Sequence, residues 1–259
     1  MCICILKTKD GKITEERLKQ ASIANSDGWG LLFNIDDFLI YKKNNTNIDE
    51  FDKYYNSVCG NIIIHFRTAS SSGFGKEYCH PFFANKNLAF VHNGNLFHFS
   101  SAFKDTNRKD KKIDTIRFNE QILQKLPENF LDNEEIFNTL NTYCKDQMSK
   151  MIFMNNQGKI WIINEEHGEW KDGCWYSNRG MNNYAGYGYS GAYEYNKGDI
   201  RHKGGLSTIQ MFSEKQKKEW FRCNCCNGWY KIKNEYNVYD SNEVCNSCVL
   251  YYNLREYCK

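Results

Sequence analysis

Short apolar runs of strand length recur along this 259-residue chain, and their order limits the fold. Strand-like runs come first, two helical segments follow, and a hairpin-like pair of runs comes after them. A parallel sheet needs a long crossover between neighbouring strands, whereas short turns can join antiparallel strands. The order therefore predicts an α+β protein in which antiparallel sheets pack against helices.

Apolar spacing, turn residues and a cap at Thr14 give the expected elements. Strands are expected at residues 2–7, 28–34, 37–43, 61–66 and 87–94, with a hairpin at 151–163. Helices are expected at residues 14–24, 48–58, 113–126 and 133–144.

The composition is ordinary for a globular protein, with 41% hydrophobic and 25% charged residues. The net charge of +3 is too small to indicate a nucleic-acid partner by itself. No apolar run approaches the roughly 20 residues of a membrane helix, so no membrane partner is expected. Lys7, Lys9 and Asp10 precede any signal-peptide core. We therefore expect a cytoplasmic protein, whose twelve cysteines serve metal binding or catalysis more than disulfides.

Composition divides the chain into three parts. Residues 1–180 hold the expected strands and helices, and residues 181–217 are rich in Gly, Tyr and Asn without periodicity. The middle part is predicted to be a linker or a mobile loop. Residues 218–259 form a separate, cysteine-dense module.

The cysteine-dense module carries two Cys-x-x-Cys pairs, Cys223 with Cys226 and Cys245 with Cys248, separated by 18 residues. This spacing is typical of a structural zinc site with four thiolates, and the module resembles a zinc ribbon. Cys225 is an alternative to Cys223, although the two-residue spacing favours Cys223. Metal would supply folding energy to a module too small to bury much core. Nearby aromatic and basic residues leave nucleic-acid binding, protein docking or stabilisation alone as alternative roles.

Polar residues follow several expected strands, and Cys2 follows the initiator methionine. The motifs are, in chain order, Asp27-Gly28-Trp29-Gly30, His65-Phe66-Arg67-Thr68-Ala69-Ser70, His80-Pro81, His92-Asn93-Gly94 and Asp114-Thr115. Each alone has a structural explanation as a turn, a surface arginine or a helix cap. Together they resemble the glutaminase domain of class II glutamine amidotransferases, which are hydrolases with an N-terminal nucleophile (Ntn).

The resemblance covers residues 1–180 and implies a fold. It implies a four-layer αββα Ntn-hydrolase sandwich, in which two antiparallel sheets lie between helices, with the small zinc ribbon added after it. This agrees with the fold class expected from the order of the apolar runs.

The resemblance also implies a mechanism. Removal of Met1 would leave Cys2 with a free α-amine beside its thiol. Cys2 Sγ would attack the side-chain amide of glutamine, form a γ-glutamyl thioester and release ammonia, with the α-amine as the base. The Asn93 side chain and the Gly94 N–H would stabilise the oxyanion.

A second set of residues would bind the substrate. Arg67 would hold the α-carboxylate of glutamine and Asp114 its α-ammonium, and Ser70 and His80 would belong to the same site. Departures from the family pattern around Phe66 and Ser70 leave a larger γ-glutamyl compound as an alternative substrate.

Class II glutaminase domains are usually fused to the enzyme that consumes the ammonia, and we expect no such domain after residue 180. A separate ammonia-accepting enzyme is therefore the expected partner. The alternatives are a stand-alone amidohydrolase of another γ-glutamyl compound, and a non-catalytic adaptor that binds nucleic acid or protein on the same scaffold.

We predict one zinc ion per purified chain, measured by elemental analysis. Cys223→Ser should lose the metal, whereas Cys59→Ser, in the first 180 residues, should keep it. Because four thiolates fill the coordination sphere, the zinc has no open position for chemistry. Chelation should therefore unfold residues 218–259 and leave glutamine turnover by residues 1–180 largely unchanged. Metal-free protein would contradict the zinc prediction.

Overall fold

The computed structural model describes residues 2–45, 48–69, 75–100 and 112–178, and the backbone of two short strands at 220–222 and 229–231. Two antiparallel sheets form the centre of the first 178 residues of this part of the chain. Within these ranges, none of the helices has the length and apolar character of a membrane span.

The first sheet has the strand order β3-β2-β4-β1-β10-β9. Its strands are β1 (Ile3–Lys7), β2 (Trp29–Ile35), β3 (Phe38–Asn44), β4 (Ile62–Phe66), β9 (Glu169–Lys171) and β10 (Cys174–Tyr176). The second sheet has the order β5-β6-β7-β8. Its strands are β5 (Phe82–Asn85), β6 (Leu88–Asn93), β7 (Lys150–Asn155) and β8 (Ile160–Ile163).

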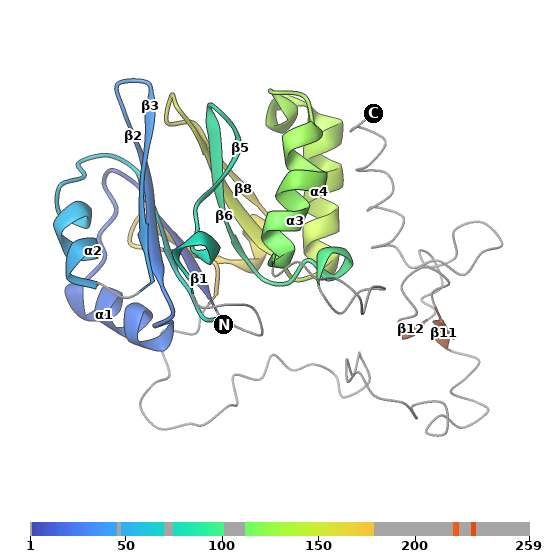
Figure 1. Cartoon of the computed structure of the whole chain (residues 1–259), viewed down its shortest axis with the longest axis horizontal. Coiled ribbons are helices and arrows are strands. Elements are labelled where there is room, and N and C mark those ends of the chain that lie inside the picture. The colour runs from blue at the N-terminus through green and yellow to red at the C-terminus, as the bar shows by residue number, and fades with distance from the viewer. Residues whose placement is uncertain are drawn as a thin grey trace.

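Helices cover the outer face of each sheet (Figure 1). α1 (Glu15–Ala24) and α2 (Ile48–Tyr55) lie against the first sheet, and α3 (Asp114–Gln121) and α4 (Glu134–Asp146) lie against the second. Short 3-10 turns complete the connections: η1 (Lys76–Tyr78), η2 (Phe97–Phe99), η3 (Leu123–Lys125), η4 (Phe130–Asp132) and η5 (Glu165–His167). The expected four-layer arrangement is therefore confirmed for the described residues.

Strand β1 is buried on both faces, because each face meets a different layer. Ile3 and Ile5 pack toward α1 and α2, whereas Cys4 and Leu6 pack between the two sheets. Successive side chains of a strand point to opposite faces, so an almost continuous apolar run is what such a strand requires. The run Ile3–Leu6 meets that requirement.

Alternation along the other strands builds the core between the sheets. Leu32, Ile63 and Trp175 come from the first sheet, and Ala89, Val91, Ile152 and Met154 come from the second. Residues of opposite parity on the same strands, such as Phe90 and Phe153, pack against α3 and α4. Because side chains alternate between the two faces of a strand, one set forms the core between the sheets and the other set forms the outer cores between each sheet and its helices.

The helix expected at 113–126 is shorter in the structure. α3 ends at Gln121, because Ile122 leaves the helical region with φ −123° and ψ −73°. The 3-10 turn η3 then follows, and the side chains of Ile122, Leu123 and Leu126 are all buried in the outer core. Packing against the sheet thus overrides a sequence pattern that fits a longer helix.

Strands β5, β9 and β10 were missing from the sequence prediction. They are only four, three and three residues long, which is too short for a periodic signal. Strands β11 (Trp220–Arg222) and β12 (Trp229–Lys231) form a separate antiparallel pair. The proposed linker and the four predicted zinc ligands lie outside the described residues, so the predictions for them remain untested.

Residues Cys79–Pro81 cross the first sheet directly over Gly30. A Cβ atom at Gly30 would lie 1.8 Å from the carbonyl oxygen of His80, so this position has no room for a side chain. Lys43 Nζ fixes the same segment by donating to the carbonyls of Cys79 at 2.8 Å and Pro81 at 3.2 Å. Gly30 therefore permits a close approach that brings His80 onto the sheet.

We predict that Gly30→Ala lowers the free energy of unfolding by about 1–3 kcal/mol or more, because the new methyl group overlaps backbone. Gly60→Ala is the matched control, since nothing lies within 4 Å of an added Cβ there. Urea unfolding of both variants measures the difference. Equal stabilities would mean that residues 79–81 move away from Gly30 at little energetic expense.

Candidate active site

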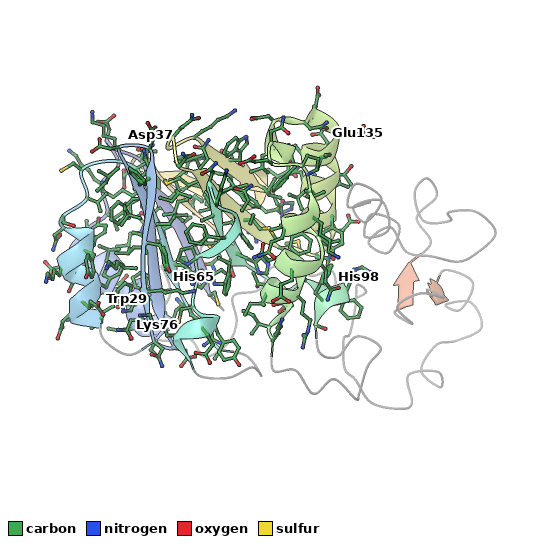
Figure 2. The ribbon with its side chains drawn as sticks, turned by 45° about the horizontal axis from the view of Figure 1, so that its top comes forward. Trp29, Asp37, His65, Lys76, His98 and Glu135 are labelled. Carbon is green, nitrogen blue, oxygen red and sulfur yellow. The ribbon has the colours of Figure 1, made fainter. Side chains whose placement is uncertain are left out.

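Strand alternation aims three polar side chains at the space between the sheets. Cys2 precedes inward-facing Cys4 by two residues, Asn93 follows Val91 by two, and Ser177 follows Trp175 by two. These residues stand at the ends of β1, β6 and β10. Figure 2 shows His65 in the same inner layer and Trp29 on the side of α1 and α2.

Cys2 Sγ contacts the main chain of Thr68. The Thr68 N–H donates to the sulfur at 3.3 Å, and the thiol donates to the Thr68 carbonyl at 3.4 Å. Burial raises the pKa of the Cys2 thiol, and the Thr68 hydrogen bond and the Arg67 guanidinium oppose this increase. Among the described residues, the sulfur makes no hydrogen bond to an imidazole or a carboxylate. No side-chain base in that part of the chain is therefore in hydrogen-bond contact with the thiol.

The Asp27-Gly28 turn meets the segment that follows β4. The Asp27 N–H donates to the Arg67 carbonyl at 2.9 Å, and the Arg67 N–H donates to the Gly28 carbonyl at 2.7 Å. Asp27 Oδ2 accepts the Ala69 N–H at 2.7 Å. Two motifs that stand about forty residues apart in the sequence thus form one loop pair beside Cys2.

Arg67 is buried, with 4% of its surface exposed, although it directly follows β4. Its guanidinium lies 5.7 Å from the centre of the Tyr78 ring. Burial raises the pKa of the Cys2 and Cys79 thiols, and the positive charge of Arg67 opposes this increase at both. A buried guanidinium suits recognition of a carboxylate.

Asn93 and Gly94 lie at the end of β6. Asn93 Nδ2 donates to Ser177 Oγ at 2.7 Å, and its Oδ1 is buried without a hydrogen-bond partner among the described residues. Gly94 has φ +136°, and a Cβ atom there would lie 2.5 Å from Ser149 Oγ. Glycine is therefore required for the backbone to turn away from the strand beside Asn93.

Asp114 begins α3 and holds the loop after β6. Its Oδ2 accepts the Leu96 N–H at 2.8 Å, and its Oδ1 accepts the Thr115 N–H at 2.7 Å. Both oxygens thus bind backbone within the protein, which is the structural role of an acid at a helix start. A carboxylate has about four acceptor positions, so Asp114 keeps capacity for another donor.

Three buried histidines line the interior beside the site. The ring centres of His65 and His80 are 4.1 Å apart, and those of His80 and His92 are 6.3 Å apart. His92 contacts Thr115 Oγ1 at 2.8 Å and Ser149 Oγ at 3.3 Å. Burial lowers the pKa of His65 to about 3 and that of His80 well below its ordinary value. The predicted substrate ligand His80 is therefore a neutral, packed side chain.

Ser177 and Asn178 were not identified from the sequence. Asn178 Nδ2 donates to the Cys2 carbonyl at 2.8 Å, and Ser177 contacts both Cys4 and Asn93. Both residues directly follow a buried strand, Cys174–Tyr176. Polar residues at the end of an apolar run were the signal that identified the other motifs. The same signal could have identified Ser177 and Asn178.

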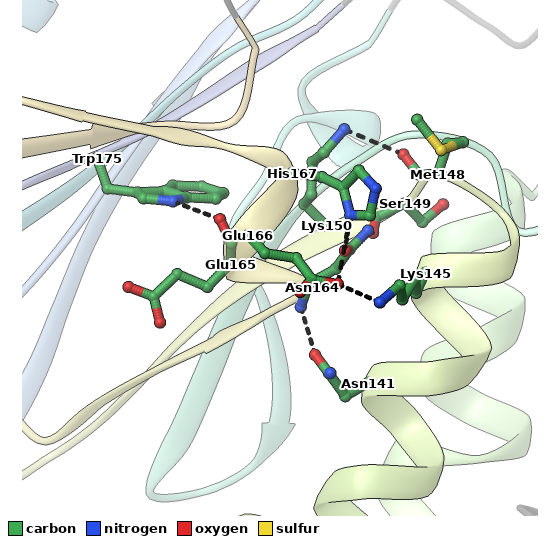
Figure 3. A network of polar contacts seen from close by, with 10 residues as sticks. All are labelled: Asn141, Lys145, Met148, Ser149, Lys150, Asn164, Glu165, Glu166, His167 and Trp175. Atoms are coloured by element: carbon green, nitrogen blue, oxygen red, sulfur yellow. Dashed lines mark hydrogen bonds and ion pairs between the residues drawn. The ribbon is translucent and has the colours of Figure 1, made fainter.

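The strand that carries Ser177 is anchored by a polar network near the end of the second sheet (Figure 3). Trp175 Nε1 donates to the Glu165 carbonyl at 3.1 Å. Asn164 donates from its backbone to Asn141 Oδ1 at 2.6 Å and from its side chain to the Ser149 carbonyl at 2.8 Å. The network therefore connects β10 to β7 and α4. Because Ser177 and Asn178 directly follow β10, it also fixes where these two residues begin.

The remaining predicted ligands cannot be placed. Ser70 and the four cysteines of the predicted zinc site lie outside the described residues. Within the described ranges, no group of three or more His, Cys, Asp or Glu residues is arranged to hold a metal ion.

A cavity of about 260 Å³ lies at the opposite end of β6 from Asn93. Asn87, Glu128 and Trp161 are among its lining residues. It contains none of the predicted site residues and is separate from the surroundings of Cys2.

The chain was compared with known proteins. It matches no protein-family model, and it matches no curated protein at a significant level. Among solved structures it resembles a glutamine aminotransferase class-II domain protein from Silicibacter pomeroyi, with 13% identity and a TM-score of 0.37 over 68% of this chain and 87% of that one. It also resembles the glutamine phosphoribosylpyrophosphate amidotransferase of B. subtilis, with 15% identity and a TM-score of 0.36. That match covers 68% of this chain but only 41% of the other, and both likenesses are distant.

We predict that the free energy of unfolding falls as the pH is lowered from 7 to 5. The unfolded chain protonates its histidines near pH 6.5, whereas His65 stays neutral in the folded protein down to about pH 3. The folded state therefore binds fewer protons, and each such histidine contributes a slope of up to about 1.4 kcal/mol per pH unit. Urea unfolding should show a smaller slope for His65→Phe than for the unsubstituted protein. Identical slopes would contradict a neutral, buried His65.

Proposed function

We propose that this protein is an N-terminal-nucleophile amidohydrolase of the class II glutamine amidotransferase type, which hydrolyses the side-chain amide of glutamine. One observation carries the proposal. The Cys2 thiol is held by the backbone of Thr68, close to the buried Arg67, and it contacts no side-chain base among the described residues. An amine on Cys2 itself is the base that this arrangement calls for.

The proposed reaction begins with Cys2 as the first residue, after removal of Met1. Its α-amine, with a pKa of about 7.7–8.0, takes the thiol proton while Sγ attacks the amide carbon of glutamine. The new C–S bond gives a tetrahedral oxyanion, and its collapse breaks the C–N bond. The amine returns the proton to the departing ammonia.

Water completes the reaction. The α-amine accepts a proton from water as the oxygen adds to the thioester carbon, and the C–S bond then breaks. Glutamate leaves, and the sulfur recovers its proton. This sequence conserves atoms and charge without any cofactor.

The alternative base would be a histidine, and the surroundings of Cys2 argue against it. Burial raises the pKa of the thiol, so attack at neutral pH needs a base. The rings of His65 and His80 pack against each other, and burial makes both weak bases. A free α-amine would have its ordinary pKa of about 7.7–8.0, so it would not be weakened as a base in this way.

The substrate-binding part of the proposal rests on complementary charges. Arg67 would pair with the α-carboxylate, because a guanidinium donates two parallel hydrogen bonds to it. Asp114 would accept from the α-ammonium with the acceptor capacity that remains beside its two backbone bonds. Asn93 and Gly94 would donate to the oxyanion.

Two further parts of the proposal concern partners. The ammonia would pass to a separate acceptor enzyme, and a structural zinc would stabilise residues 218–259. Without turnover, the alternative is an adaptor that uses the same scaffold for binding.

An alanine inserted between Met1 and Cys2 tests the mechanism. We expect glutamine hydrolysis to fall at least about 100-fold, the lower range of general-base catalysis, with unchanged thermal stability. Intact mass establishes which N-terminus is present, and released glutamate measures activity. Cys59→Ala serves as the control and should keep full activity, because Cys59 lies exposed on the surface. Normal turnover by the insertion variant would refute the N-terminal mechanism.

Arg67→Lys tests whether Arg67 binds the α-carboxylate of the substrate. Lysine keeps the charge but loses the planar fork, so binding of glutamine should weaken by roughly 1–3 kcal/mol, seen mainly in KM. Glutamine analogues without the α-carboxylate should be poor substrates of the unsubstituted enzyme. Equal cleavage of such analogues would mean that the pocket is not a glutamine pocket.

A further inference from the structure

We propose that Ser177 is a positioning residue of the active site, which holds the Asn93 carboxamide with its N–H groups directed at the reacting carbonyl oxygen. The inference rests on the proposed function, since the oxyanion that Asn93 would stabilise forms in the proposed amide hydrolysis. It adds a residue that the family motifs found in the sequence do not include.

Ser177 joins the two sheets at the end where Cys2 lies. Its N–H donates to the Cys4 carbonyl at 2.9 Å, and its Oγ accepts the Cys4 N–H at 2.9 Å. From the other sheet, the Asn93 carboxamide contacts the same Oγ at 2.7 Å. All three residues are almost completely buried, so water cannot replace these bonds.

One of these bonds fixes the direction of the Ser177 proton. A backbone N–H can only donate, so Ser177 Oγ must be the acceptor toward Cys4. The hydroxyl proton is then available for a partner on another side. The Asn93 carboxamide, 2.7 Å away, stands in that position.

The Asn93 carboxamide keeps its hydrogen bond to Ser177 when the amide is turned by 180°, and the turn gives the Ser177 proton an acceptor. With Nδ2 on Ser177 Oγ, the Asn93 Oδ1 is buried without a partner among the described residues. The two ends of a carboxamide have nearly the same shape, so turning it keeps the 2.7 Å contact. Ser177 O–H then donates to Oδ1, and Nδ2 takes the place of the unpartnered oxygen. Its N–H groups are thereby free to stabilise an oxyanion.

The neighbouring residue links this arrangement to the nucleophile. Asn178 Nδ2 donates to the Cys2 carbonyl at 2.8 Å. Adjacent residues at the end of β10 therefore fix both the backbone of Cys2 and the amide of Asn93. Relative placement of nucleophile and oxyanion donor is what preorganised catalysis depends on.

The test compares kcat and KM for glutamine in Ser177→Ala, Asn93→Ala and the double variant. Ser177→Ala should lower kcat about 10- to 100-fold with little change in KM, a smaller loss than the about 100- to 1,000-fold of a deleted oxyanion donor. In the Asn93→Ala background, Ser177→Ala should cause no further loss, because Ser177 acts through Asn93. Ser177→Thr, which keeps the hydroxyl, should retain most of kcat.

Controls separate positioning from a loss of stability. Ile136→Val weakens the core under α4, away from the site, and should leave kcat unchanged. If Ser177→Ala does not fold, Ser177→Cys replaces it, because the thiol has similar shape but is a weak donor. A wild-type kcat in the substituted protein, or losses that multiply in the double variant, would overturn the inference.

Labelling by a glutamine analogue with a diazoketone in place of the amide separates this inference from the proposed function. Labelling of Cys2 in the unsubstituted protein, found by mass spectrometry, would support the nucleophile and pocket independently of kcat. Absence of both labelling and turnover would overturn the proposed function and this inference together. Turnover with an unaffected Ser177→Ala variant would overturn this inference alone.

Discussion

Face-to-face packing of the two sheets is the constraint on which the rest of the structure depends. It buries β1 on both sides, with Ile3 and Ile5 toward the helices and Cys4 and Leu6 toward the second sheet. The side chains of β1, β6 and β10 that face the other sheet alternate along each strand. At the strand ends, the next positions in this alternation are Cys2, Asn93 and Ser177. The site therefore lies where the apolar core between the two sheets ends and polar residues occupy the next inward-facing positions.

The electrostatics of the site follow from the same burial. Desolvation raises the pKa of the Cys2 thiol and lowers those of His65 and His80, so neither histidine is suited to activate the sulfur. Arg67 supplies a buried positive charge that opposes the increase in the pKa of the Cys2 thiol. A free α-amine would combine nearness to the sulfur with a pKa in the working range, which is why the proposed mechanism needs Cys2 at the chain end.

Close backbone approaches give the site its rigidity. Gly30 admits the carbonyl of His80, and Gly94 turns the chain against Ser149. Asp114 then binds the backbone on both sides of the loop after β6, and Ser177 connects that strand to Cys4. The groups proposed for catalysis are thus held by hydrogen bonds between segments that are remote in sequence.

The sequence by itself determined the elements whose signals are local. Alternating and continuous apolar runs placed β1, β2, β4 and β6, Thr14 capped α1 as expected, and the polar motifs put Arg67 and Asn93 at the ends of strands. Only the tertiary structure decided where α3 ends, which three-residue segments pair as strands, and which polar atoms meet. The bond from Cys4 to Ser177 spans 173 positions, and no local propensity carries information over that distance. Such contacts exist because two sheets bury their inner faces against each other, and that burial is a property of the whole chain.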